Sequence, residues 1–418
     1  MRLFFTFSFI VLYSAATAQA AKEIIITNPG NIDRKDELVV FTRAQLERKL
    51  GPINKFIQVK AGGKQLIAQH DDINGDGKWD EVIILYSFKP KEKVTFDIST
   101  TNTSNSGTAT QRAHVRLIKK NSDDSWGKSI REEEMPLRNP ATDFSKQPLP
   151  LYLTEGPAWE NDKVGFRLYF DVRNGKDIWG KRTARMVLDS VGTKVEPSYH
   201  ELHDWGMDIL HAGKSLGAGA LALLVPFDKG KDTLIRLGGE NIQHTVYKQI
   251  ADGPLRGIFQ ITYDWVVNGK PVRITEQTSI WGGQYFYESR VWVTGAPKGT
   301  KLVSGIASFY ENVFRAYRVN NTDVLFSHGQ QSENKDYLGL AILIPSNNFS
   351  FAGSAPNGNS EVLNTYIGAQ NVKEGSPCVF RFVGGWEKSD FRFSELKLFK
   401  SFVDDEATKM GSELLISW

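Results

Sequence analysis

The residues best suited to acid–base chemistry lie close together in the segment 199–208. It contains Tyr199, His200, His203, Trp205 and Asp208. Histidine exchanges a proton near neutral pH, and a nearby carboxylate fixes its tautomer and raises its basicity. The segment therefore predicts a catalytic or substrate-binding loop, with a polar surface loop carrying incidental histidines as the alternative. A zinc-protease motif is excluded, because His200 and His203 lack the required helical spacing.

A second polar group lies upstream, on a strand predicted over residues 164–171. Arg167, Tyr169 and Asp171 alternate there with apolar residues, so they share one face of the strand. That face lines a cleft or, in the alternative interpretation, carries an ordinary solvated Arg–Asp pair. Further candidate substrate-binding residues precede it, namely Trp159, Glu160 and Asn161.

A glycine-rich turn over residues 213–219 follows the histidine segment and carries Lys214. This lysine is the one charged group of the turn and is a candidate ligand for an anionic substrate, although a plain surface lysine is the commoner outcome. A nucleotide site is rejected, because the upstream glycine of a phosphate loop would fall at Asp208.

Residues 72–81 resemble a calcium loop. Asp72, Asn74, Asp76 and Asp80 place oxygen-bearing side chains at alternating positions, and Gly77 permits the sharp turn. The spacing predicts a structural Ca²⁺ site, with a tight hairpin turn as the equal alternative. No organic cofactor is expected.

Residues 1–20 read as a cleavable signal peptide, with Arg2, an apolar run over 3–13 and small residues at the cleavage site. The apolar run is too short to span a bilayer. We therefore expect a periplasmic or secreted protein without a membrane anchor. Cys378 is the only cysteine, so no intramolecular disulfide can form.

The charge pattern argues against a nucleic-acid partner. Loss of Arg2 with the signal peptide lowers the formal net charge from +3 to +2, and no long basic run is present. The 10 Trp, 13 Tyr and 25 Phe residues suit strands and sugar-stacking surfaces, although most are expected in the core.

Short alternating runs predict a mainly β protein, a large antiparallel β-sandwich with few short helices. Asn268-Gly269 between two such runs is a strong hairpin signal. Helices are expected only over residues 42–50 and 400–410. The polar stretch 99–111 suggests a boundary between an N-terminal β region, 21–111, and a catalytic sandwich, 112–418, unless the two form one continuous domain.

Several motifs resemble a family of unknown-function domains from bacterial polysaccharide-utilisation loci. They are residues 72–81, Gly156-Pro-Ala-Trp-Glu-Asn, Arg167-Leu-Tyr-Phe-Asp, and His203-Asp-Trp-Gly-Met-Asp followed by Gly213-Lys-Ser-Leu-Gly-Ala-Gly. The resemblance implies an enzyme of acidic polysaccharide breakdown that is similar to the ulvan oligosaccharide dehydratases. The strand pattern over 260–288 also resembles the galactose-mutarotase-like supersandwich.

The expected substrate is therefore an acidic, uronate-containing oligosaccharide, cleaved or dehydrated by elimination. Such a reaction needs a cation on the substrate carboxylate, a base at the adjacent carbon and an acid at the leaving oxygen. We assign Arg167 to the carboxylate, His203 as the base, Tyr169 or His200 as the acid, and Trp159 and Trp205 as stacking platforms. A glycoside hydrolase using two of Glu160, Asp171 and Asp208, and a non-catalytic carbohydrate-binding protein, are the alternatives.

Overall fold

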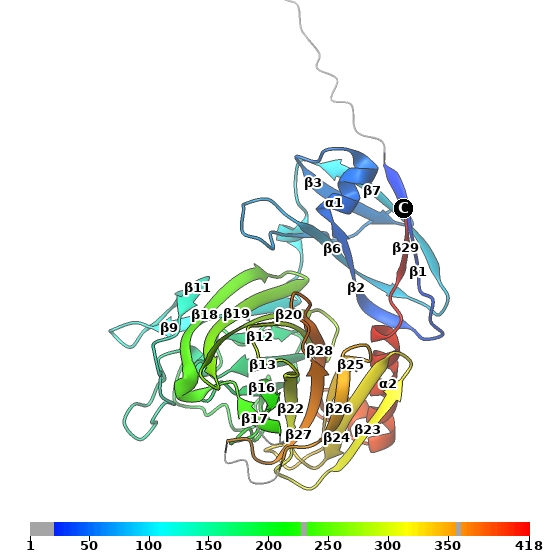
Figure 1. Ribbon diagram of the computed structural model, residues 1–418. Coiled ribbons are helices and arrows are strands. Elements are labelled where there is room, and N and C mark those ends of the chain that lie inside the picture. Colours follow the sequence, from blue (N-terminus) through cyan, green and yellow to red (C-terminus); the bar gives the residue numbers. More distant parts are fainter. Residues whose placement is uncertain (1–20, 227–231, 357–360) are drawn as a thin grey trace, which may run out of the picture.

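The computed structural model describes residues 21–226, 232–356 and 361–418. The predicted signal peptide lies outside the described residues. The rest of the chain folds into a smaller domain built mainly from N-terminal residues and a larger β-sandwich (Figure 1). No helix in the described ranges has the length and apolar character needed to cross a membrane.

The smaller domain packs two antiparallel sheets and a helix around its own core. Thr42 caps helix α1 (Arg43–Leu50) in a capping box with Gln45. The five-stranded sheet contains β29 (Leu415–Ser417), β1 (Lys22–Thr27), β7 (Lys93–Thr101), β3 (Phe56–Ala61) and β4 (Lys64–Gln65) in that order. The three-stranded sheet contains β2 (Arg34–Thr42), β6 (Glu81–Phe88) and β5 (Gln69–Asp71).

The C-terminal strand β29 belongs to this N-terminal sheet. Ile25 pairs with Ser417 and Thr27 with Leu415, so both ends of the described chain meet in one sheet (Figure 1). The last residues therefore lie apart from the sandwich that the range 112–418 was expected to form.

The sandwich is built on a nine-stranded antiparallel sheet. In spatial order its strands are β11 (Glu132–Glu134), β18 (Ile242–Asp252), β19 (Arg256–Val267), β20 (Lys270–Trp281), β21 (Phe286–Thr294), β28 (Cys378–Trp386), β25 (Leu338–Pro345), β24 (Thr322–Gly329) and β23 (Val313–Val319). The predicted hairpin joins β19 to β20, and Asn268 and Gly269 both have positive φ, as a tight hairpin turn requires.

Two five-stranded sheets share the main core with the nine-stranded sheet. One contains β15 (Gly206–Asp208), β14 (Lys176–Lys181), β13 (Val164–Leu168), β12 (Ala158–Asn161) and β8 (Ala113–Arg116). The other contains β17 (Asp232–Arg236), β16 (Ala218–Pro226), β22 (Lys301–Ala307), β27 (Thr365–Asn371) and β26 (Phe349–Ser354). The expected antiparallel β-sandwich is confirmed.

The remaining elements are short. Strands β9 (Ile118–Lys120) and β10 (Trp126–Ser129) pair with each other. Single 3₁₀ turns cover Ser106–Thr108, Leu153–Glu155, Gly239–Asn241 and Phe391–Phe393. Helix α2 (Leu396–Met410) packs on β24 and β25, and, as expected, the described residues contain few helices.

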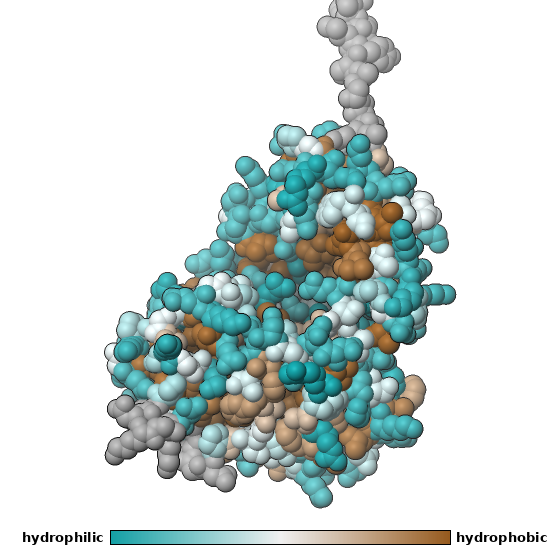
Figure 2. All heavy atoms as spheres, turned by 45° about the vertical axis from the view of Figure 1, so that its right-hand side comes forward, coloured by the Kyte–Doolittle hydropathy of each residue, from teal (hydrophilic) through white to brown (hydrophobic). Residues whose placement is uncertain are grey.

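A groove runs between the two domains. Two cavities of about 400 and 570 Å³ share a lining that includes Leu38 and Val40 of β2, Glu288 and Arg290 of β21, and Arg381 of β28. Hydrophobic surface gathers on the smaller domain beside this junction (Figure 2). The wall from the sandwich is charged, whereas the wall from β2 is partly apolar.

Candidate functional site

The outer face of the sheet β15-β14-β13-β12-β8 carries a layer of buried charged side chains. Period-two alternation sends Phe166 and Ile178 into the main core and Arg167 and Asp177 to the opposite face. The segment 182–205 covers that face, with Leu188 and other apolar residues packed against Trp179. The buried polar layer comprises His114, Arg116, Glu160, Arg167, Asp177, Lys181 and Asp208.

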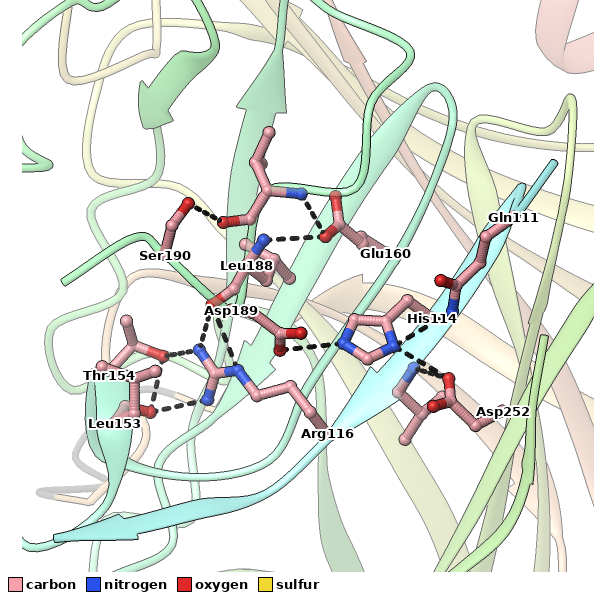
Figure 3. Close-up of polar contacts among 12 residues, drawn as sticks. Gln111, His114, Arg116, Leu153, Thr154, Glu160, Leu188, Asp189, Ser190 and Asp252 are labelled. Carbon is pink, nitrogen blue, oxygen red and sulfur yellow. Dashed lines mark hydrogen bonds and ion pairs between the residues drawn. The ribbon is translucent and has the colours of Figure 1, made fainter. Parts of the chain in front are cut away.

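One half of the layer fixes the covering segment (Figure 3). Glu160 accepts a hydrogen bond from the ammonium group of Lys181, and its other oxygen accepts the backbone N–H groups of Val187 and Leu188 at 2.6 and 2.8 Å. The Arg116 guanidinium donates to the Leu188 carbonyl at 3.0 Å. Glu160 is fully buried, so its geometry assigns it a structural role instead of contact with a substrate.

His114 closes this half of the layer. Its ring nitrogens lie 2.9 Å from Asp189 on the covering segment and 2.8 Å from Asp252 on β18. Burial lowers the pKa of His114, but the hydrogen bonds to the two carboxylates outweigh burial and raise the pKa to about 10. The imidazole is therefore a protonated clamp at neutral pH.

The other half of the layer is centred on Arg167. Its Nη2 donates to Asp177 at 2.8 Å and to Asp208 at 2.5 Å, and all three side chains are buried. The Tyr169 hydroxyl accepts from the same Nη2 at 3.0 Å and donates to Asp177 at 2.6 Å. Burial and the Asp177 carboxylate raise the pKa of Tyr169 well above its usual value, so the phenol keeps its proton.

His200 brings this cluster to the surface. Its Nδ1 lies 3.4 Å from Asp208 Oδ2, and 61% of its side chain is exposed. Partial burial and the positive charge of Arg167 lower the pKa of His200, so the imidazole is neutral near pH 7. Asp208 Oδ1 is buried and accepts no hydrogen bond from the described part of the chain. A neutral base and an unsatisfied acceptor thus lie side by side.

We call His200, Asp208, Arg167, Asp177 and Tyr169 the Arg167 cluster. Tyr199 joins it, since Arg167 Nη1 donates to the Tyr199 hydroxyl at 3.5 Å. The guanidinium already donates hydrogen bonds to two buried carboxyl groups, those of Asp177 and Asp208. Arg167 therefore positions its neighbours, and the predicted contact with a substrate carboxylate does not fit its geometry.

Two predicted substrate-binding residues upstream of Arg167 are corrected by their burial. Trp159 is fully buried and stacks on Phe166 at 5.8 Å, so it is a core residue and no stacking platform. Asn161 is also fully buried and donates to the carbonyls of Trp281 and Gln284.

Asp171 lies beyond the end of β13, which stops at Leu168. Its carboxylate accepts from Arg173 Nε at 3.0 Å. It does not share the face of Arg167 as the predicted longer strand required, because the chain turns after Tyr169.

His203 and Trp205 form a separate pair. His203 Nε2 lies 2.7 Å from the Ser198 carbonyl, and the His203 ring stacks on Trp205 with the centroids 6.2 Å apart. Trp205 is half-buried and its centroid lies 6.1 Å from that of Trp179. His200, and not His203, therefore reaches the Arg167 cluster, while Lys214 is exposed on a neighbouring cavity.

Asp177 was not among the predicted site residues. It pairs in register with Arg167 across β13 and β14. Its alternation with Ile178 in the sequence was a usable signal, but the register that places it opposite Arg167 depends on how the two strands pair.

The predicted calcium loop forms a hydrogen-bonded turn. The Asp72 carboxylate accepts the N–H groups of Gly75 and Gly77 at 2.7 Å, and Asp80 accepts that of Ile73 at 2.8 Å. Nowhere in residues 21–226, 232–356 and 361–418 do three His, Cys, Asp or Glu side chains gather around one metal position. The Ca²⁺ site stays a prediction.

The chain matches the model of a family described as Domain of unknown function (DUF4861) over residues 26–416. It belongs to this family. A relative by sequence is the "Uncharacterized protein P7" of Formosa agariphila, 25% identical over 283 residues, which are 63% of this chain and 67% of that protein. The expectation of an unknown-function family is thereby confirmed, and the link to ulvan dehydratases stays a prediction.

Two solved structures that the chain matches come from Enterococcus faecalis. An α-mannosidase of strain V583 has a TM-score of 0.49 and 10% identity, covering 96% of this chain and 46% of its own. A protein in glycosyl hydrolase family 38 has a TM-score of 0.49 and 10% identity, with coverages of 95% and 47%. The DUF4861 chain spans about half the length of these structures.

Proposed function

We propose that this DUF4861 protein is an exported carbohydrate-active enzyme that acts on uronate-containing oligosaccharides by elimination, as a dehydratase or lyase. The observation that carries the proposal is the Arg167 cluster. It joins an exposed neutral imidazole, His200, to a protonated phenol, Tyr169, through the buried pair Asp208 and Arg167.

The proposed chemistry uses His200 as the base. With Nδ1 facing Asp208, Nε2 is left to remove the proton beside the substrate carboxylate. The C–H electron pair forms a carbon–carbon double bond while the C–O bond at the next carbon breaks. Tyr169, whose raised pKa keeps the phenol protonated at neutral pH, donates its proton to the departing oxygen, which leaves as water or as an alcohol.

Elimination is favoured over hydrolysis by the state of the alternative carboxylates. Glu160 is fully buried against Lys181, and Asp171 is paired with Arg173. A hydrolase needs two carboxyl groups that face the scissile bond. Of the three acids considered, Asp208 alone lies beside an exposed proton-transfer group.

The test is to incubate residues 21–418 with oligosaccharides from acidic algal and plant polysaccharides and to read the products by mass and ultraviolet absorbance. A product lighter by one water, or a new absorbing unsaturated uronate, supports elimination. Gain of one water with a new reducing end and no chromophore indicates a hydrolase. Tight binding without a product indicates a binding protein.

Two histidine variants, at His200 and at His244, test the assignment of the base. His200→Ala is expected to lower turnover by about 10²-fold or more, as for loss of a general base. The matched control is His244→Ala, because His244 is also partly exposed and lies 3.0 Å from a carboxylate, that of Glu134. Full turnover by His200→Ala, or equal losses in both variants, contradicts the assignment.

A further inference from the structure

A cavity of about 260 Å³ lies beside Arg173, whose guanidinium stacks on Tyr169 of the Arg167 cluster. Among the residues that line it are Arg173, Lys214, Arg236, Gly239, Glu240 and Glu361. We call it the Arg236 cavity. Lys214 is the one residue of this lining that the sequence predicted as a substrate ligand.

Two arginines of the cavity lining, Arg173 and Arg236, lie near the proposed acid, Tyr169. The Arg173 guanidinium stacks on the Tyr169 ring at 4.1 Å. A Cβ atom placed on Gly175 would lie 3.1 Å from the Tyr169 ring and 3.3 Å from Arg236 Nη2. Arg236 therefore approaches the same tyrosine, and the glycine is needed for this close contact.

Arg236 is held in place by backbone carbonyl groups. Its Nε donates to the Arg173 carbonyl at 2.8 Å, and its Nη1 donates to the Ser215 carbonyl at 2.8 Å. Burial lowers the pKa of Arg236, and the carboxylates of Glu361 and Asp171 oppose this shift. A partly desolvated guanidinium in this state is stabilised by an anion that completes its fork of donors.

Lys214 supplies a second cation. Its side chain is exposed, and its backbone carbonyl accepts a hydrogen bond from Arg236 Nη1 at 3.3 Å. The backbone contact holds the two residues together at one edge of the cavity. Glu240 and Glu361 also line it, so the lining combines cations with carboxylates.

We propose that the Arg236 cavity is a subsite for one uronic acid ring of the substrate. Arg236 and Lys214 bind its carboxylate, and Glu240 accepts hydrogen bonds from its hydroxyl groups. Arg167 does not take this role, because its Nη2 already donates to Asp177 and Asp208. This inference rests on the proposed function for its place in catalysis, but binding of the sugar acid is independent of turnover.

The experiment measures the thermal unfolding midpoint of residues 21–418 in the presence of D-galacturonate, D-glucuronate, D-galactose or D-glucose. We expect a saturable upward shift with a uronate and no shift with the neutral sugars at the same concentrations. Lys214→Gln should weaken the apparent uronate affinity by about tenfold, the effect of losing one charge-assisted hydrogen bond. Lys270→Gln, at the exposed tip of the β19–β20 hairpin, is the matched control.

Arg236→Lys keeps the charge but loses the fork, and it should also weaken uronate binding. If this variant unfolds, Lys214→Gln alone decides. No uronate-dependent shift in the natural sequence, or the same affinity in Lys214→Gln, overturns the subsite. Uronate binding that depends on Lys214 without any turnover supports the subsite and refutes the proposed elimination. Turnover by elimination with a uronate affinity that does not depend on Lys214 supports the proposed function and refutes the subsite.

Discussion

Replacing Arg167 with methionine removes the cation that lies between Asp177 and Asp208. Both carboxylates are buried, with side-chain exposures of 1% and 3%. Removing one partner of a buried ion pair costs about 3–5 kcal/mol, because an uncompensated charge remains in a low-dielectric site. We therefore expect Arg167→Met to lower the free energy of unfolding by about 3–5 kcal/mol near pH 7.

The loss should depend on pH. Burial raises the pKa of Asp208, and Arg167 opposes this shift; without Arg167 the folded-state pKa rises further above the unfolded value of about 3.9. A carboxyl group whose pKa is raised in the folded state lowers the free energy of unfolding as pH rises above the unfolded pKa. The penalty of Arg167→Met should therefore be larger at pH 8 than at pH 5.

Urea unfolding followed by tryptophan fluorescence measures both effects. The double variant Arg167→Met with Asp208→Asn should recover part of the loss, since one stranded charge is removed. Arg273→Met is the matched control, because Arg273 pairs with Asp264 at 2.7 Å but is 63% exposed; such a pair contributes about 0–1 kcal/mol. A cost for Arg167→Met that equals this control, or that does not change with pH, would refute the reasoning.

Three further predictions concern the covering segment, the sheet and the turn. His114 has a folded-state pKa of about 10, above its unfolded value of about 6.5, so the stabilisation it gives the fold is full below pH 6.5 and is lost as pH rises through 10. In urea unfolding, His114→Asn should therefore lower the free energy of unfolding more at pH 6 than at pH 10. Equal losses at the two pH values would exclude a protonated clamp. Gly206→Ala should lower the free energy of unfolding by at least about 3 kcal/mol, because a Cβ atom there would lie 1.7 Å from the Gly180 carbonyl oxygen and residue 206 has a φ of +133°. An unchanged thermal unfolding midpoint would contradict the pairing of β14 with β15. Calcium should raise the thermal midpoint relative to a chelator, and Asp76→Ala should abolish the rise; no effect of calcium on the natural sequence would leave residues 72–81 as a turn only.

The sequence by itself determined the local structure. Alternation of apolar residues predicted the antiparallel strands, Thr42 marked the start of the first helix, and Asn268-Gly269 marked a hairpin. These features depend on neighbouring residues and on backbone conformations that few residue types adopt, so they can be read without the fold. The grouping of Arg167, Tyr169, His200 and Asp208 as candidate site residues also came from the sequence.

The tertiary structure decided which polar residues are exposed and which are buried. Trp159 and Glu160 both lie close to the candidate strand in sequence. The nine-stranded sheet buries Trp159, and the segment 182–205 buries Glu160. The choice of His200 over His203 depends on the path of that covering segment, and the pairing of β29 with β1 joins residues at opposite ends of the described chain. Such outcomes depend on contacts between residues distant in sequence, which period and composition do not encode.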